Sequence, residues 1–362
     1  MNKKILFLIN GLGLGNSIRC FSIIQRLRKS ETEISIVCSG NSAWFFKDKI
    51  NTENFFEIDQ IQYGKKGNNL SIYNTLLLTR QNLRIIKENV KKISNIIDNI
   101  KPNIIVTDSV YLQKKIKNFQ IPILAINNSD FTKNLFFNFK NKPLSIHAQF
   151  YFVEYLDYLY HQNFPDLVIS PTLFEKYDQN MGLKNNVKII RVGPIFREDL
   201  KYIKSKNNNS NCLVMLSGSA FNTKVNFEKI NEKMTVNVIN KNLDPKVDQN
   251  NVNYYTKVKN NIDLINNAQF SVINAGFSAI SELFYLRKPM ILIPIANHAE
   301  QWTNAKHIEK NNIGIIANEH NYEKKMFEMI ENINFFKENY KKTNLNNDGA
   351  LNAAEIILNF NK

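Results

Sequence analysis

Short apolar runs alternate with longer amphipathic stretches along the first 200 residues. Asn16–Arg28 is amphipathic, and the apolar residues of Asn74–Ile100 recur at intervals of three and four, so both segments are predicted to be helices. The apolar runs predict strands at Lys4–Asn10, Glu33–Cys38, Phe55–Ile61, Ile104–Ser109, Ile123–Asn127, Leu167–Ser170 and Val187–Val192. Strands that alternate with helices predict a parallel sheet wound on both faces.

Residues 201–211 form a polar stretch rich in Lys and Asn, which we interpret as a linker between two domains. A second series of predicted strands follows it, at Cys212–Leu216, Met234–Ile239, Asn253–Tyr255, Phe270–Ile273 and Met290–Ile293. We therefore expect an α/β protein with one domain over residues 1–200 and another over residues 212–344. A C-terminal helix is expected over residues 345–362, where it can pack back on the first domain.

The composition is 43% hydrophobic and 22% charged, as in ordinary soluble globular proteins. No apolar run approaches the roughly 18–20 residues that a membrane span needs. Met1–Ile9 imitates the charged and apolar regions of a signal peptide, but its apolar run breaks at Asn10 and fits a buried first strand better. We therefore expect a cytoplasmic protein. Cys20, Cys38 and Cys212 are too widely spaced for a disulfide framework and are interpreted as buried apolar side chains.

The net charge of +15 raises the question of a nucleic-acid or membrane partner. The lysines are scattered and no basic stripe carries interleaved aromatic residues, so we expect no nucleic-acid partner. The stretch Phe131–Phe164 is dense in Phe, Tyr and Leu, with Lys133, Lys140 and Lys142 among them. Such a surface can lie peripherally on the inner face of an anionic membrane. Burial against the core of the first domain is the alternative that we prefer.

Two small-residue turns follow predicted strands. Gly11-Leu-Gly-Leu-Gly-Asn-Ser comes after the first strand, where Gly13 and Gly15 allow backbone N–H groups to approach an anion at a helix N-terminus. The spacing is not the dinucleotide fingerprint, and no acidic residue ends the second strand, which argues against NAD. Ser217-Gly218-Ser219 is a similar turn in the second half and can offer N–H and hydroxyl groups to a phosphate.

The segment Asn274–Asn304 carries the most specific chemistry. A predicted strand ends at Asn274 and leads through Gly276 into a helix, so that a phosphate can sit at the helix N-terminus. Glu282 on that helix can accept hydrogen bonds from two ribose hydroxyls. Glu300 and Gln301 follow the next strand, and a carboxylate beside an amide suits the hydroxyls of a hexose.

At these residues the chain resembles the C-terminal domain of the family 28 glycosyltransferases, the group of the peptidoglycan N-acetylglucosaminyltransferase and the plastid galactolipid synthases. The resemblance is specific over Val258–Gly314, and the Gly-rich turn and Val192-Gly-Pro-Ile support it. It implies the GT-B fold, two facing Rossmann-like domains with the active site in the cleft between them. The donor-binding residues that it implies are Gly13, Gly15, Ser217, Gly218, Ser219, Val258, Asn274, Gly276, Phe277, Ser278, Glu282, His298, Glu300 and Gln301.

The function implied by the resemblance is transfer of a sugar, expected to be UDP-linked, to a glycan or lipid-linked acceptor in cell-envelope or surface polysaccharide synthesis. Many members of the family place His after the N-terminal glycines, where this chain has Asn16, which cannot take up a proton at neutral pH. An inverting transferase needs a general base. Asp108, at the end of a predicted strand, is our preferred replacement, with a helix N-cap as the equal alternative. Asp130 is the second candidate.

No Asp-x-Asp pair occurs in the sequence. We therefore expect no metal and no other cofactor, because helix N-termini and backbone N–H groups can stabilise the leaving group. Two alternatives remain open because of Asn16. One is a nucleotide-sugar hydrolase or epimerase on the same fold, and the other is a protein that binds nucleotide sugars without catalysis.

Overall fold

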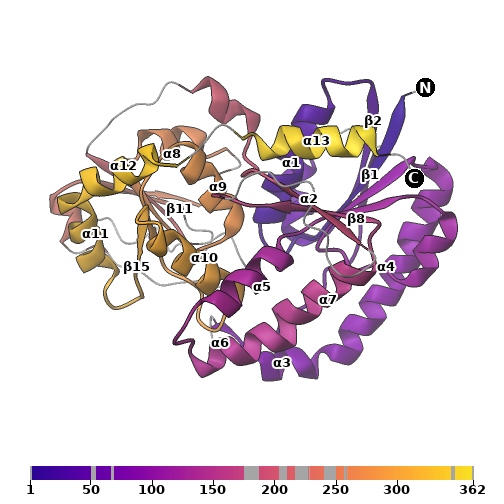
Figure 1. Cartoon of the computed structure of the whole chain (residues 1–362), viewed down its shortest axis with the longest axis horizontal. Helices are drawn as coiled ribbons and strands as arrows, with labels where there is room; N and C mark the ends of the chain where they lie inside the picture. The colour runs from indigo at the N-terminus through magenta and orange to yellow at the C-terminus, as the bar shows by residue number, and fades with distance from the viewer. Residues whose placement is uncertain are drawn as a thin grey trace.

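The computed structural model contains two α/β domains that lie side by side, each built on a parallel β-sheet (Figure 1). The two Rossmann-like domains predicted from the sequence are therefore confirmed. The structure describes residues 2–49, 54–66, 69–174, 187–203, 210–216, 227, 229–239, 250–256, 258, 260–343 and 347–360.

The first domain has a seven-stranded sheet whose described pairings are all parallel. The strands run in the order β3 (Phe55–Glu57), β2 (Thr32–Cys38), β1 (Lys3–Ile9), β6 (Ile104–Asp108), β7 (Ile123–Ile126), β8 (Leu167–Pro171) and β9 (Lys188–Val192). Side chains of the interior strand β1 alternate between two cores: Ile5 and Phe7 belong to one, and Leu6 and Leu8 to the other. Burial on both faces explains why these strands read as continuous apolar runs.

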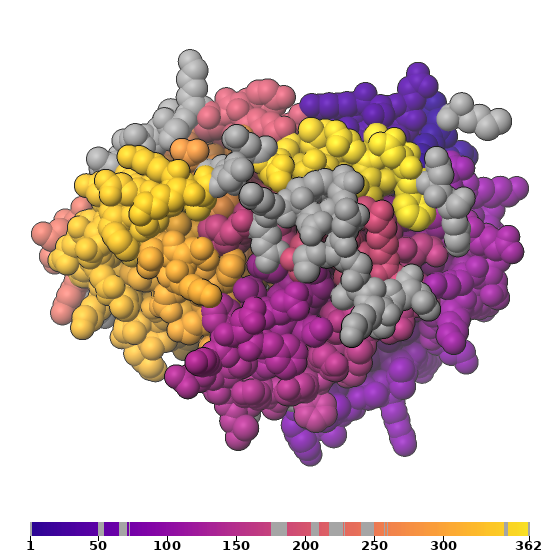
Figure 2. Space-filling model, viewed as in Figure 1, coloured from indigo at the N-terminus to yellow at the C-terminus, as the bar shows by residue number. Residues whose placement is uncertain are grey.

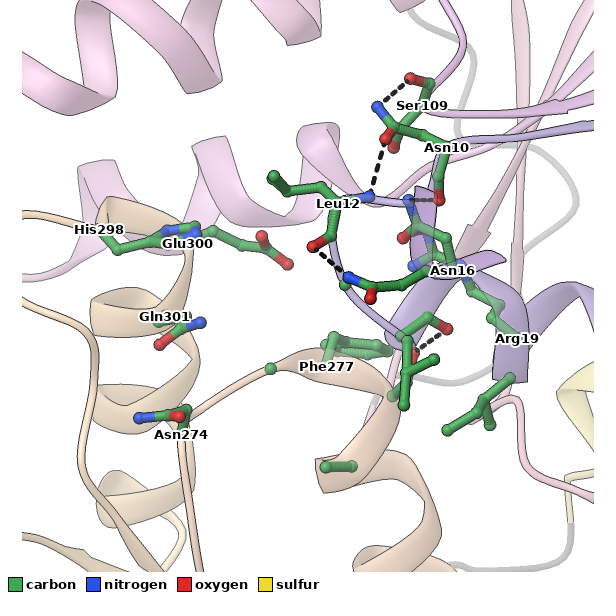
Figure 3. Close-up of a pocket in the computed structure, with 18 of the residues that line it drawn as sticks. Asn10, Leu12, Asn16, Arg19, Ser109, Asn274, Phe277, His298, Glu300 and Gln301 are labelled. Carbon is green, nitrogen blue, oxygen red and sulfur yellow. Dashed lines mark hydrogen bonds between the residues drawn. The ribbon is translucent and has the colours of Figure 1, made fainter. Parts of the chain in front are cut away.

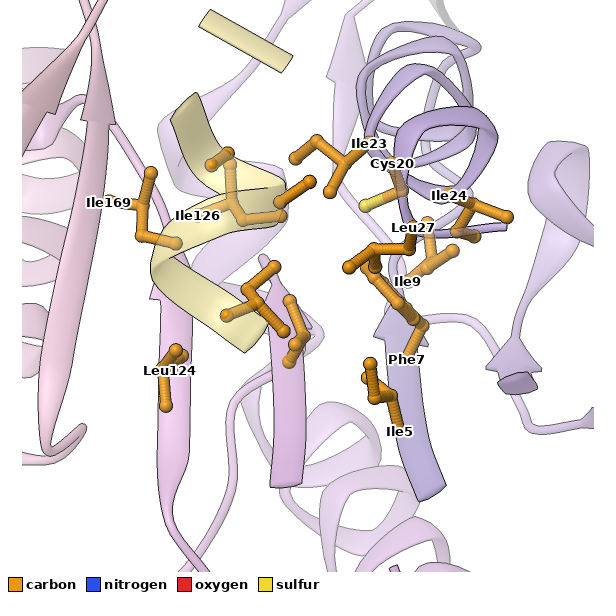
Figure 4. Close-up of a cluster of buried hydrophobic side chains, with 14 of the residues drawn as sticks. Ile5, Phe7, Ile9, Cys20, Ile23, Ile24, Leu27, Leu124, Ile126 and Ile169 are labelled. Carbon is orange, nitrogen blue, oxygen red and sulfur yellow. The ribbon is translucent and has the colours of Figure 1, made fainter. Parts of the chain in front are cut away.

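Helices cover both faces of this first sheet. On one face lie α1 (Gly15–Leu27), α2 (Gly40–Phe46) and α13 (Gly349–Asn359), which pack on Ile5, Phe7 and Ile9 (Figure 4). On the other face lies α4 (Thr79–Ile100), which contributes Val90, Ile93 and Ile97 to the second core. The carboxyl ends of β1, β6 and β7 are therefore held on a rigid frame.

Helix α13 returns from the second domain to pack against α1 of the first (Figures 1 and 2). Asp348 caps its N-terminus, accepting hydrogen bonds from the N–H groups of Ala350 and Leu351 at 3.1 Å each. Asp348 also forms an ion pair with Arg26 of α1, at 3.1 Å. At the other end, the Lys3 ammonium donates to the Leu358 carbonyl at 2.7 Å. A cation is favoured there because the C-terminus of a helix carries a partial negative charge. The helix is thus fixed to the first domain at both ends.

The second domain has a six-stranded sheet in which the described pairings are parallel. Its strands run in the order β12 (Val252–Tyr255), β11 (Thr235–Ile239), β10 (Asn211–Met215), β13 (Phe270–Ile273), β14 (Met290–Leu292) and β15 (Gly314–Ile316). The helices α8 (Ile262–Asn267), α9 (Phe277–Tyr285) and α10 (Ala299–Lys310) cover one face, and α11 (Tyr322–Glu331) covers the other. Helix α12 (Ile333–Lys341) contributes Phe336 and Tyr340 to the two cores.

A helical arm of the first domain reaches the second domain. It consists of α5 (Ser129–Asn138), α6 (Leu144–Gln149), the π-helical turn η3 (Phe150–Glu154) and α7 (Tyr155–Asn163), and α10 packs against the first three. On its inner side Phe136 and Phe150 are fully buried, with stacked rings 3.7 Å apart. On its outer side Leu144 is 86% exposed and Phe152 is 60% exposed. The aromatic stretch therefore has a buried face and an exposed apolar face.

Several of the predicted elements differ from the structure. The predicted helix Asn74–Ile100 is two helices, α3 (Ile72–Leu77) and α4, because the chain leaves helical geometry at Leu78. The hydroxyl of Thr79 donates to the Leu76 carbonyl there, a local bond that competes with the helical ladder. The predicted strand Phe55–Ile61 is shorter, and the three-residue strand β15 was not predicted.

The three cysteines are free and buried, as predicted. Across the described ranges of the chain, no helix is long and apolar enough to cross a membrane.

Candidate active site

A cavity of about 600 Å³ lies between the two domains, and residues of both line it. Its walls include loops at the carboxyl ends of parallel strands, the edge at which open α/β sheets bind ligands. The sequence-predicted residues that line it are Gly13, Gly15, Asn16, Val258, Asn274, Gly276, Phe277, Ser278, Glu282, His298, Glu300 and Gln301. Ser217, Gly218 and Ser219 lie outside the described residues.

The Gly-rich turn joins β1 to α1 at the bottom of the cavity. A Cβ atom on Gly11 would lie 1.6 Å from the Ser39 carbonyl oxygen, so this close approach requires glycine. Asn10 fixes the turn, because its amide donates to the Ser109 carbonyl at 2.9 Å and its Oδ1 accepts from the Leu12 N–H at 3.0 Å (Figure 3). These hydrogen bonds therefore fix the backbone of the turn, which lines the cavity.

Asp108 ends β6 and is completely buried. Its two oxygens accept from the Arg19 guanidinium, at 2.9 Å from Nε and 2.6 Å from Nη2. It does not cap a helix, since the next one, η2, begins at Lys114. It is absent from the described cavity lining, whereas Arg19 and Asn16 are part of it. Arg19 therefore lines the cavity, and Asp108 lies behind it.

Asp130, the second candidate base, lies in the first turn of α5 and is 6% exposed. One carboxylate oxygen accepts from the Ser170 hydroxyl at 2.6 Å, and the other lies 3.2 Å from Nη2 of Arg191. It is likewise absent from the described cavity lining. The contacts of Asp130 tie α5 to β8 and β9.

Helix α9 points its N-terminus at the cavity. It follows β13 through Asn274 and Gly276, and its first residues Phe277 and Ser278 are on the wall. The first N–H groups of a helix have no partner within the helix and favour an anion. The Ser278 hydroxyl donates to the Gly15 carbonyl of the first domain at 2.9 Å, so the first turn of α9 touches the Gly-rich turn.

Glu282 lies one turn farther along α9 and is 3% exposed. The Arg197 guanidinium binds both of its oxygens, at 2.6 Å from Nε and 2.7 Å from Nη2. Arg197 also donates to Oδ1 of Asn261 at 2.7 Å, and all three side chains line the cavity. Glu282 is thus on the wall, with its charge balanced by an arginine that the sequence analysis did not single out.

The loop before α10 forms the opposite wall. Asn297 has a φ of 61°, a left-handed conformation that Asn tolerates, and turns the chain toward the helix. Gln301 accepts from the Ile295 N–H at 2.9 Å and so fixes the loop. Glu300 directs its carboxylate across the cavity toward Leu12 and Asn16 of the first domain (Figure 3). Burial lowers the pKa of His298 to about 4, so its imidazole is neutral near pH 7.

Two further carboxylates line the cavity from the arm, Glu154 in η3 and Asp157 in α7. Burial, and then the nearby Glu300 carboxylate, raises the pKa of Glu154 to about 8. Asp157 accepts from the Tyr111 hydroxyl at 2.8 Å and the Asn127 amide at 2.9 Å. Burial acts to raise the pKa of Asp157, whereas the His161 imidazole and these hydrogen bonds act to lower it. The net result is a pKa below the ordinary value of an aspartate.

The sequence analysis missed Glu154, Asp157, Arg19 and Arg197. The acidic pair had a signal, two carboxylates three residues apart in an otherwise aromatic stretch, which places them on one helix face. Arg197 follows the motif Val192-Gly-Pro-Ile that supported the family resemblance.

Comparison with known proteins supports the resemblance inferred from the motifs. The family model for glycosyl transferase family 1 matches residues 3–333. An uncharacterized glycosyltransferase of Methanosarcina acetivorans is 23% identical over 329 residues, which cover 86% of this chain and 84% of that protein.

A second relative is the UDP-N-acetylglucosamine–N-acetylmuramyl-(pentapeptide) pyrophosphoryl-undecaprenol N-acetylglucosamine transferase of Clostridium botulinum. It is 31% identical over 108 residues, 28% of this chain, and the match spans only 30% of that relative's length. Among solved structures, Medicago truncatula UGT71G1 complexed with UDP-glucose superposes with a TM-score of 0.63 at 12% identity, covering 98% of this chain and 94% of that one. The predicted GT-B fold and resemblance are confirmed.

Proposed function

The chain belongs to glycosyl transferase family 1 and is a glycosyltransferase, and on that premise we propose that it transfers a sugar from a UDP-linked donor to a glycan or lipid-linked acceptor. The observation that carries the proposal is the cavity in which the N-terminus of α9 and the first turn of α10 face the Gly-rich turn of α1. We propose a role in cell-envelope or surface polysaccharide synthesis. The Clostridium relative supports this role because its name describes transfer of N-acetylglucosamine to an N-acetylmuramyl-(pentapeptide) pyrophosphoryl-undecaprenol.

On the donor side, the diphosphate is proposed to lie at the N-terminus of α9, beside Gly276 and Ser278. The N–H groups in the first turn of α9 can offset the charge that develops on the leaving diphosphate. Glu300 and Gln301 are proposed to hold the sugar. With these groups the reaction proceeds by inversion and without a metal ion. Full activity in the presence of a chelator is the expected result, and activity that collapses until Mg²⁺ or Mn²⁺ is added would contradict it.

On the acceptor side, we define the arm surface as the exposed side chains Phe137, Leu144, Tyr151, Phe152 and Leu156. Exposed apolar side chains beside lysines can enter the interface of an anionic bilayer. We propose that the protein is cytoplasmic and that its arm surface contacts the inner face of the cell membrane, where it reaches a lipid-linked acceptor.

Flotation with anionic vesicles at low salt tests this contact. The double variant Leu144→Glu, Phe152→Glu is expected to stay at the bottom of the gradient, whereas Leu351→Glu, at an exposed position on α13, floats like the wild type. Equal flotation of both variants would reject the arm surface, and no flotation of the wild type would reject the membrane contact itself.

The donor is tested by thermal unfolding in the presence of UDP-, GDP-, dTDP- and CMP-linked sugars. A ligand at 100 times its Kd stabilises the protein by about 2.7 kcal/mol, so a UDP-sugar is expected to raise Tm by several degrees. Preference for another nucleotide would refute the UDP assignment. Rapid turnover without an acceptor would favour a hydrolase or epimerase, and binding without turnover in the presence of membrane glycolipids would favour a binding protein.

A further inference from the structure

Two acidic residues line the cavity from opposite sides of the domain boundary. Glu154 lies at the end of η3 in the first domain, and Glu300 lies in the first turn of α10 in the second. Both line the cavity, and the Glu300 carboxylate helps to raise the pKa of Glu154. The Glu154 side chain is 13% exposed, so the cavity is its route to solvent and substrate.

Gln149 of α6 holds Glu154 in place and joins it to the second domain. Its amide nitrogen donates to Oε1 of Glu154 at 2.8 Å, and its own oxygen accepts from the Ala299 N–H at 2.8 Å. A carboxylate accepts about four hydrogen bonds. In the described part of the chain, the Gln149 amide donates one hydrogen bond to the Glu154 carboxyl group, which leaves its other acceptor positions available to a substrate hydroxyl.

The other acids near the cavity are less suited to accept a proton. Asp108 and Asp130 are bound by arginines, and Asp157 is held in its ionised form by three neighbouring groups, which makes it a weak base. Glu154 has the opposite environment, because burial and the neighbouring Glu300 both favour its protonated form. It also belongs to the arm of the first domain and faces the residues proposed to hold the donor sugar.

We propose that Glu154 is the general base of the transfer reaction, and this inference rests on the proposed function. As the acceptor oxygen forms its bond to the anomeric carbon of the donor sugar, its proton passes to the Glu154 carboxylate. The bond from that carbon to the diphosphate oxygen breaks, and its electron pair leaves with the nucleoside diphosphate. Glu300 then acts as a hydrogen-bonding partner of the sugar that also sets the proton affinity of Glu154.

The charge state of the surroundings fits this role. The titratable groups that face Glu154 are Glu300 and His298 at the start of α10, Asp157 on α7, and Tyr63 and Tyr111 in loops of the first domain. Near pH 7 the imidazole and the two phenols are neutral, because burial lowers the pKa of His298 and raises that of each tyrosine. Asp157 is ionised, whereas burial raises the pKa of both Glu154 and Glu300.

The test uses the full chain, the UDP-sugar that stabilises it most in the thermal screen and crude membrane glycolipids as the acceptor, with release of UDP as the readout. Glu154→Ala and Glu154→Gln are expected to lower kcat by about 100-fold or more, the range of a general base, while the Kd for UDP by calorimetry stays within threefold. Glu88→Gln, an exposed glutamate on α4, is the matched control and keeps wild-type kcat.

Two further readouts separate a base from a structural residue. In the wild type kcat rises with pH toward a plateau above the pKa of Glu154, about 8, and this rise disappears in Glu154→Gln. Sodium azide, a nucleophile with no proton to lose, restores turnover of Glu154→Ala and gives a glycosyl azide. Retention of a third or more of kcat, or loss of kcat without azide rescue, overturns the proposal. If the wild type turns over none of the sugars, it is the proposed function that fails.

Discussion

The buried pair Arg19–Asp108 allows a test of what Asp108 does. The change Asp108→Asn keeps the size of the side chain but leaves the Arg19 guanidinium without its counter-charge. The Arg19 side chain is only 8% exposed and that of Asp108 is fully buried, so water cannot replace the lost interaction. Breaking a buried ion pair in this way costs about 3–5 kcal/mol.

The cost is expected to appear in the free energy of unfolding, as a fall in Tm of roughly 6–20 °C for a domain of this size. The double variant Arg19→Met, Asp108→Leu removes both charges together and is expected to recover most of the loss, to within about 2 kcal/mol of the wild type. Urea unfolding followed by circular dichroism, with all members of the double-mutant cycle, measures each step.

The opposite pattern would refute this reasoning. If Asp108→Asn unfolds within about 1 kcal/mol of the wild type while UDP release falls by orders of magnitude, then Asp108 acts in catalysis and its contact with Arg19 is secondary. A double variant no more stable than Asp108→Asn would show that the residues contribute independently.

Three other outcomes follow from the contacts described. Asp348→Ala removes the N-cap of α13 and the ion pair with Arg26, so the free energy of unfolding in urea is expected to fall by about 1–3 kcal/mol. An unchanged unfolding midpoint would contradict the capping role. Gly11→Ala forces a Cβ atom against the Ser39 carbonyl and is expected to cost about 3 kcal/mol or more by the same assay, unless the loop can move aside. Burial holds the pKa of His298 at about 4, below its ordinary 6.5, so its contribution to the free energy of unfolding is present above pH 6.5 and is lost as the pH falls toward 4. The variant His298→Asn is expected to reduce this loss of stability between pH 6.5 and 4 by up to about 3 kcal/mol. The same dependence of unfolding free energy on pH in wild type and variant would contradict the prediction.

The sequence predicted the sheets well because parallel strands have a strong local signature. The core strands Lys3–Ile9 and Ile104–Asp108 are covered on both faces, so each contains an unbroken apolar run, Ile5–Ile9 and Ile104–Val106, that stands out from its polar neighbours. The strand Gly314–Ile316 is only three residues long, too short for any period to be recognised. The break at Leu78 was missed because apolar residues continue at helical spacing on both sides of it.

The loops of the candidate site were predictable for a similar reason, since glycines and polar residues directly after apolar runs mark the carboxyl edge of a sheet. The pairing of charged residues, in contrast, was not predictable from the sequence. Arg19 meets Asp108 across 89 positions of sequence, and Arg197 meets Glu282 across 85. No local pattern specifies which of many basic residues will reach a given carboxylate. Whether the site residues act as the sequence predicts remains a prediction for the experiments above.

The anchoring of α13 also bears on how the protein is synthesised. Strand β1 leaves the ribosome more than 300 residues before α13, the helix that covers Ile5 and Phe7 beside α1. Throughout translation of the second domain, part of an apolar sheet surface therefore stays without its cover, a state that favours aggregation or capture by chaperones. A nascent chain stalled before Gly349 is expected to hold its first domain in a less stable form than the completed chain does.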